Sequence, residues 1–219
     1  MIEKVFSGPY LRRLDNIKQW SEKDTLKTES VSQHSYKVAV YTTVILEEML
    51  GKEELAERLQ GFKLKCIQYA MFHDWDESLI KRDISHEIKY NKWNGDEFRA
   101  LLDRFSAHAA MLEFDQKYIN GENEASILII NSIVRPDKDV KAVVKFADWL
   151  AMLAYLQRER ALGNHTLDES YAYCVKCIVP AYETLKNTLR KFFIETEETR
   201  LNTTWSDELI ANLVNSVKS

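Results

Sequence analysis

Glycine and proline are scarce in this chain, which contains 6 Gly and 3 Pro in 219 residues. Strands joined by tight turns consume both residue types, because Gly supplies positive φ and Pro presets the first turn position. Hydrophobic residues make up 45% of the chain and aromatic residues 11%, which is enough to build a packed core. The sequence therefore predicts an all-α helical bundle that forms a single domain over residues 1–219.

Hydrophobic periodicity outlines the helices of this bundle. Helical spacing continues from about Ser7 to Trp20, and a polar loop follows it. Ser30 and Gln33 have the spacing of a capping box, which predicts a helix that stops at Gly51. The remaining helices are expected over about residues 54–73, 96–118, 139–162, 167–194 and 206–217.

The periodicity also predicts which face of two helices is buried. In the helix that follows Ser30, the apolar face consists of Val38, Thr42, Ile45, Leu46 and Met49. In the helix that ends near His73, the predicted buried stripe consists of Leu64, Ile67 and Met71.

Polar residues interrupt the apolar faces of three helices. These residues are His34, the adjacent pair His73-Asp74, and Asp148. A charged carboxylate on an apolar face is costly unless it is paired or binds a metal. Each residue alone is more often a hydrogen-bonded core or surface group, but two imidazoles and two carboxylates in this order suit a divalent cation with open positions for water and substrate. The sequence therefore predicts a catalytic metal site and leaves Co, Mn, Zn, Mg, Fe and Ni as alternatives.

Charge and cysteine content narrow the range of partners. The 34 acidic and 30 basic residues give a net charge of −4 without a long basic block, so no stable nucleic-acid partner is expected. The three cysteines, Cys66, Cys174 and Cys177, lack the spacing of a disulfide framework, which is typical of reduced thiols in the cytosol. No signal peptide and no long apolar run are found, so a cytoplasmic protein without a membrane partner is expected.

The order of the four polar residues resembles the HD-domain superfamily of metal-dependent phosphohydrolases, and within it the bacterial 5′-deoxynucleotidase branch. The matching segments are residues 13–20, 27–35, 70–77 and 144–150. The strings T-E-x-V-S-x-H-S, over residues 28–35, and H-D-x-x-E, over residues 73–77, are the most specific. The resemblance covers about residues 8–164, which would form the metal-site core and leave C-terminal helices over about residues 167–218.

The resemblance implies a role for each matching residue. The metal ligands would be His34, His73, Asp74 and Asp148. Glu77 matches the carboxylate that orients or deprotonates the attacking water. Trp20 matches an aromatic residue that packs against the sugar and disfavours a 2′-hydroxyl, and Asp83, after a one-residue insertion, matches the acid that accepts the 3′-hydroxyl.

The chain departs from the branch at the phosphate contact. Gln19 stands where the family typically has an arginine, so either phosphate affinity comes from another residue or the phosphate is presented differently. The candidates are Lys18, Lys81, Arg82 and Lys145. The loop after Glu77 also lacks the family's usual glycine and proline, which leaves the substrate selectivity open.

These observations predict an enzyme that hydrolyses deoxynucleotides. The first expectation is a deoxynucleoside 5′-monophosphate that is split into deoxynucleoside and phosphate. One alternative keeps the fold but releases triphosphate from a deoxynucleoside triphosphate. A second alternative is a regulatory module that binds a nucleotide without turnover, although the presence of Glu77 argues against it. The resemblance also implies a homodimer, which amphipathic C-terminal helices would suit.

Overall fold

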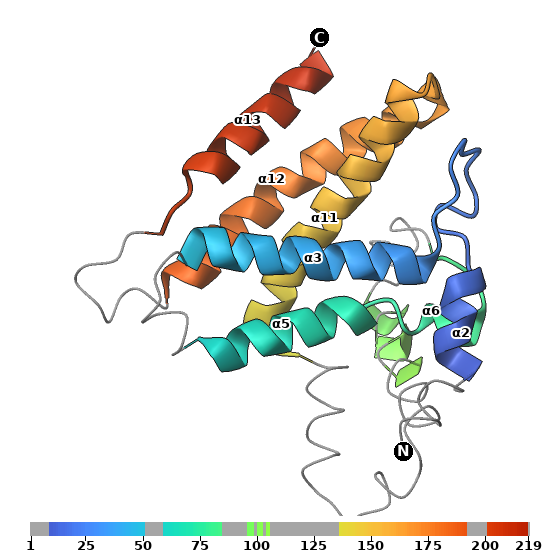
Figure 1. Cartoon of the computed structure of the whole chain (residues 1–219), viewed down its shortest axis with the longest axis horizontal. Helices are drawn as coiled ribbons and strands as arrows, with labels where there is room; N and C mark the ends of the chain where they lie inside the picture. Colours follow the sequence, from blue (N-terminus) through green and yellow to red (C-terminus); the bar gives the residue numbers. More distant parts are fainter. Residues whose placement is uncertain are drawn as a thin grey trace, which may run out of the picture. The chain divides into compact units, whose positions relative to one another are not determined.

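Helices make up every regular element in the part of the chain that the structure describes (Figure 1), which confirms the all-α prediction. The computed structural model describes residues 9–50, 59–84, 96–98, 100–102, 104–105, 136–191 and 201–218. The helices are α2 (Pro9–Asn16), α3 (Val31–Leu50), α5 (Gln60–Phe72), α6 (Glu77–Ile80), α11 (Lys138–Ala161), the 3₁₀ helix η1 (His165–Leu167), α12 (Asp168–Arg190) and α13 (Thr204–Lys218). None of the described helices has the length and apolarity needed to cross a bilayer. Most of the helix predicted over residues 96–118 lies outside the described residues.

The chain divides into two compact units. The first unit consists of Met1–Tyr36 and Met71–Pro136, and the second consists of Lys37–Ala70 and Asp137–Ser219. Both units are therefore discontinuous in sequence, and helices α3 and α5 each contribute residues to both. The single domain over residues 1–219 stays a prediction.

A small apolar core holds the first unit together, and within this unit α2 packs against α6. The core consists of Leu14, Ile17, Val31 and Trp75, with Phe72 packed against it. The ring centroids of Phe72 and Trp75 lie 4.6 Å apart. Because Trp75 is almost completely buried, burial of its ring fixes the path of the chain directly after the His73-Asp74 pair.

Helix α3 begins and ends close to where the sequence predicts. The Ser30 backbone N–H donates to Gln33 Oε1 at 3.1 Å, and the Gln33 backbone N–H donates to Ser30 Oγ at 3.3 Å. These reciprocal bonds are a capping box, and they satisfy two of the backbone donors that a helix start leaves open. All members of its predicted apolar face, Val38, Thr42, Ile45, Leu46 and Met49, are buried.

The buried face of α5 was predicted wrongly. Leu64 is 54% exposed and Met71 is 50% exposed, whereas Cys66 and Ala70 are completely buried. Helix α5 carries apolar residues around most of its circumference, so periodicity alone cannot select the face that packs inward. Packing instead buries the face that carries the small side chains of Cys66 and Ala70.

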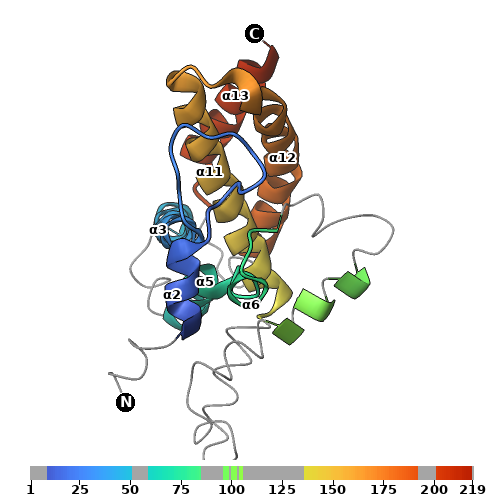
Figure 2. The same cartoon turned by 90° about the vertical axis from the view of Figure 1, so that its right-hand side faces the viewer.

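The second unit contains a pair of long helices, α11 and α12, which run side by side (Figures 1 and 2). The rings of Phe146 and Tyr182 pack across this pair with centroids 5.4 Å apart. The Tyr182 hydroxyl also forms a hydrogen bond of 2.7 Å with Ser206 Oγ, which ties α12 to α13. Gly163, with φ +89°, follows the end of α11, as its place after the predicted helix indicated.

Candidate metal centre

The two predicted histidine ligands are placed by the ends of two helices. His34 lies in the first turn of α3, where its backbone N–H donates to the Ser30 carbonyl at 2.9 Å. Its side chain is buried, with 1% of the residue exposed. His73 and Asp74 directly follow the last residue of α5, in a turn where the Trp75 N–H donates to the Phe72 carbonyl at 3.1 Å. The capping box therefore positions His34, and the buried ring of Trp75 positions His73 and Asp74.

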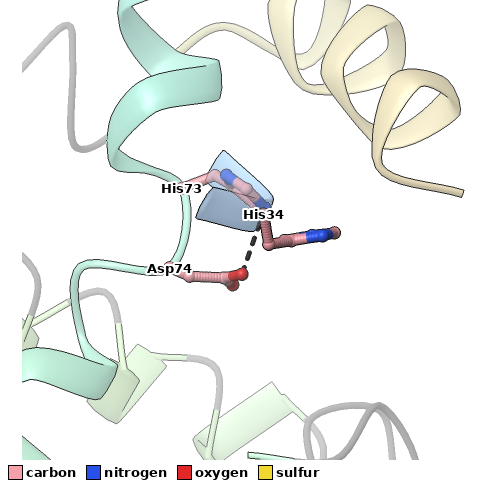
Figure 3. A group of neighbouring side chains, drawn as sticks. All are labelled: His34, His73 and Asp74. Carbon is pink, nitrogen blue, oxygen red and sulfur yellow. Dashed lines mark ion pairs between the residues drawn. The ribbon is translucent and has the colours of Figure 1, made fainter. Parts of the chain in front are cut away.

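The side chains of His34, His73 and Asp74 converge in the first unit, as Figure 3 shows. One potential ligand atom from each residue lies within 4.8 Å of the other two. The two imidazole centroids are 5.6 Å apart, and His73 Nε2 lies 3.2 Å from Asp74 Oδ2. Two nitrogen donors and one carboxylate oxygen at this spacing can surround one divalent cation.

The charge around this group also fits a cation. Among the described residues of the first unit, four carboxylate side chains are buried, those of Glu29, Asp74, Asp76 and Glu77. Buried negative charge is costly without compensation, and a divalent cation can offset two unit charges. The donor set and the buried charge therefore both fit the metal that the sequence predicts.

Glu77 lies one turn beyond Asp74 and is fully buried, with 0% of the residue exposed. Its backbone N–H donates to the Asp74 carbonyl at 3.1 Å. Its side-chain Oε1 accepts a hydrogen bond from the Ile84 backbone N–H at 3.2 Å. The backbone therefore fixes the orientation of the carboxylate that the sequence predicts to act on water.

Asp148 belongs to the second unit, where α11 holds it at 7% exposure. Lys145 Nζ lies 2.7 Å from Asp148 Oδ2 and 4.6 Å from the centroid of the Trp149 ring. The structure thus brings three of the four predicted ligands together and gives the fourth a cationic neighbour. The assignment of Asp148 as the fourth ligand stays a prediction.

The predicted sugar-binding residues Trp20 and Asp83 lie in contact, although 63 positions separate them in the sequence. The Trp20 backbone N–H donates to Asp83 Oδ2 at 2.7 Å, and the Ser21 N–H donates to the same oxygen at 3.3 Å. Trp20 has φ +60°, which is unusual for a bulky residue. Gln19, immediately before it, is buried, and its backbone N–H donates to the Glu29 carbonyl at 2.7 Å.

The predicted phosphate-binding cations occupy different environments. Lys81 and Arg82 are exposed, and Arg82 forms an ion pair with Glu22. Lys81 follows the last residue of α6 with φ +60°, a conformation that favours glycine. Lys18 is half-buried. Lys145 is the candidate whose ammonium group contacts a predicted metal ligand.

Sequence reasoning did not assign a role to Glu29. Glu29 Oε1 lies 3.7 Å from His34 Nδ1, and both residues are buried. Metal-binding histidines commonly have a carboxylate beside the ring nitrogen that does not bind the metal, because it fixes the tautomer and the ring orientation. The sequence did contain a signal for this role, because Glu29 belongs to the same T-E-x-V-S-x-H-S string as His34.

Known structures define the class of protein to which this fold belongs. The fold is similar to the crystal structure of an HD-domain phosphohydrolase from Listeria innocua, with a TM-score of 0.50 over 98% of this chain and 99% of that chain, at 20% sequence identity. The described helices therefore have the fold of an HD-domain protein. More narrowly, the family described as 5′-deoxynucleotidase YfbR-like matches residues 8–198, and the chain belongs to this family.

Two characterised relatives are similar to this chain at low identity. A 5′-deoxynucleotidase from Shewanella oneidensis is 28% identical over 157 residues, which cover 71% of this chain and 74% of that protein. A 4′-phosphooxetanocin A phosphatase from Priestia megaterium is 26% identical over 139 residues, which cover 62% of this chain. The second match spans 63% of the phosphatase, slightly less than two thirds of its length.

Proposed function

We propose that this protein is a metal-dependent phosphohydrolase that converts a deoxynucleoside 5′-monophosphate into deoxynucleoside and phosphate. The observation that carries the proposal is the convergence of His34, His73 and Asp74 one helical turn from the buried carboxylate of Glu77. The family match and the relative named as a 5′-deoxynucleotidase support the nucleotide substrate.

The metal would be held by His34, His73 and Asp74, whose ligand atoms converge. Asp148 would be the fourth ligand, on the strength of the family resemblance. A bound divalent cation supplies Lewis acidity, which lowers the pKa of water and offsets charge on the phosphate. Cobalt, manganese, zinc, magnesium, iron and nickel all suit this donor set, so the metal is left open. A homodimer is part of the proposal on the strength of the family resemblance.

Glu77 orients the attacking water and accepts its proton. The Ile84 N–H donates to Oε1 at 3.2 Å, which favours one orientation of the carboxylate. The water oxygen forms a bond to phosphorus while the bond from phosphorus to the 5′-oxygen breaks. The proton that Glu77 accepted passes through solvent to the leaving 5′-oxygen, which yields the deoxynucleoside and inorganic phosphate.

Lys145 provides the positive charge that Gln19 lacks. The ammonium group contacts Asp148, so a phosphate held beside that residue would lie within reach of a charge-assisted hydrogen bond. Lys81 and Arg82 are exposed to solvent, which makes them weaker partners for a phosphate.

Phosphate release from deoxynucleoside monophosphates, measured with added Mn²⁺, Co²⁺ or Mg²⁺, tests the proposal. Glu77→Gln keeps the shape and the hydrogen bond to Ile84 but cannot accept a proton, so kcat should fall by about 10²–10⁴-fold while metal affinity is retained. Asp74→Asn should lose both metal affinity and activity. Glu47→Gln, which alters an exposed carboxylate on α3, is the matched control and should change neither.

Two results would contradict the proposal. Release of triphosphate from a deoxynucleoside triphosphate, with no phosphate from the monophosphate, would favour the triphosphohydrolase alternative. Tight nucleotide binding without any product over a long incubation would favour the regulatory alternative.

A further inference from the structure

The loop around Trp20 has a backbone conformation that its own sequence does not favour. Trp20 has φ +60°, in the left-handed region where the Cβ atom of an L-residue crowds its own backbone. A bulky aromatic residue in this region is a genuine outlier. Such a conformation persists only where surrounding contacts hold it, and it is often found at functional sites.

The carboxylate of Asp83 provides contacts of this kind. A single oxygen, Oδ2, accepts the Trp20 N–H at 2.7 Å and the Ser21 N–H at 3.3 Å. Two successive backbone N–H groups aimed at one anion form a small anion-binding nest, and left-handed backbone geometry is what creates such a nest. The conformation of Trp20 and the position of Asp83 are therefore mutually dependent.

The segment that carries Asp83 is itself anchored to the catalytic carboxylate. The Ile84 N–H, one residue after Asp83, donates to Glu77 Oε1 at 3.2 Å. The Lys81 N–H donates to the Glu77 carbonyl at 2.7 Å, which closes the end of α6. A short path of hydrogen bonds therefore connects Glu77 to the backbone of Trp20.

We infer that Asp83 is a positioning residue, which holds the Trp20 backbone in its left-handed conformation and thereby sets the discrimination against the 2′-hydroxyl of ribonucleotides. The inference rests on the proposed function, because it concerns the sugar of the proposed nucleotide substrate. In this role Asp83 acts by holding the Trp20 backbone, which is separate from a direct contact with the 3′-hydroxyl. Oδ2 is occupied by two backbone donors, so loss of the carboxylate releases the loop that carries the indole ring.

The test compares kcat/KM for a deoxynucleoside monophosphate with kcat/KM for its ribonucleotide counterpart. Asp83→Ala should lower this ratio by about tenfold, the effect typical of losing a hydrogen bond to a charged group. Asp83→Asn retains an oxygen acceptor for the two N–H groups and should restore part of the ratio. Glu22→Gln changes an exposed carboxylate of the same loop and is the matched control, with an unchanged ratio.

A double-mutant cycle with Trp20 distinguishes the two ways in which Asp83 can act. If Asp83 acts through Trp20, Asp83→Ala lowers the ratio in the native background but has no further effect in a Trp20→Ala background. The ratio should fall by the same factor when both substrates lack the 3′-hydroxyl, as in a 2′,3′-dideoxynucleotide compared with a 3′-deoxyribonucleotide. Additive effects of the two substitutions, or a loss that disappears when both substrates lack the 3′-hydroxyl, would overturn the inference.

A measurement without turnover separates this inference from the proposed function. Acrylamide should quench tryptophan fluorescence more strongly in Asp83→Ala than in the native protein, and the difference should vanish when both carry Trp20→Phe. Unchanged quenching would show that Asp83 does not hold the loop. Absence of hydrolysis of any deoxynucleotide by the native protein would instead refute the proposed function.

Discussion

Removal of the cap of α3 should weaken folding much more than it weakens metal binding. Ser30→Ala removes the oxygen that accepts the Gln33 N–H at 3.3 Å, at the start of the turn that carries His34. Loss of a serine cap costs about 1 kcal/mol. For a domain of this size, about 1 kcal/mol corresponds to a decrease in Tm of about 2–4 °C.

The same free energy determines the effect on the metal site. About 1 kcal/mol increases the population of an opened first turn by about fivefold. The affinity for metal falls only in proportion to the population that remains closed. If the opened turn is a minor state in the native protein, Mn²⁺ affinity should therefore fall by less than about twofold. His34→Ala, in contrast, removes a ligand of the proposed metal site and should abolish tight binding of Mn²⁺.

Thermal unfolding and calorimetric titration with Mn²⁺ measure the two effects separately. Gln33→Glu is the control, because glutamate preserves the acceptor for the Ser30 N–H and should leave Tm nearly unchanged. An unchanged Tm in Ser30→Ala would refute the role of the cap. A loss of metal affinity above tenfold with little loss of stability would show that Ser30 acts on the site directly.

Two further predictions concern the second unit. Lys145→Met should raise KM for the nucleotide by about tenfold, while Mn²⁺ affinity is maintained. Lys141→Met, on the exposed side of α11, is the control and should change neither quantity. An unchanged KM for Lys145→Met would exclude Lys145 from phosphate binding. Burial raises the pKa of the Cys66 thiol to about 12, and burial together with the nearby Asp148 carboxylate raises that of Cys174 to about 12. Both thiols are therefore protonated at pH 8. Mass spectrometry should find that iodoacetamide leaves them unmodified in the folded protein and labels them after denaturation. Rapid labelling of either thiol in the folded state would contradict this burial.

Local signals explain why much of the fold and part of the site could be predicted from the sequence. The start of α3 depends on Ser30 and Gln33, three residues apart, and both bonds of the capping box form as predicted. His34 is buried because it shares the apolar side of that helix. Capping, periodicity and helix stops act within a few residues, so the chain encodes them directly.

Contacts between distant residues explain what the sequence did not reveal. The exposure of Leu64 and Met71 depends on which face of α5 the rest of the protein covers, and a helix that is apolar on most sides does not specify this. Glu29 is close to His34 in the sequence, but its position beside the ring depends on a more distant pairing, that of Lys18 with Ser30.

The contact between Asp83 and Trp20 illustrates the difference between what the sequence determined and what the tertiary structure decided. The sequence by itself determined the residue types and their order, from which an all-α fold and a metal-binding group could be predicted. The family resemblance added the expectation of an acidic residue near the sugar. Only the tertiary structure brought Asp83 to the backbone of Trp20, because that hydrogen bond closes a loop of 63 residues. No short-range pattern encodes such a contact, since its formation depends on the packing of everything between the two residues.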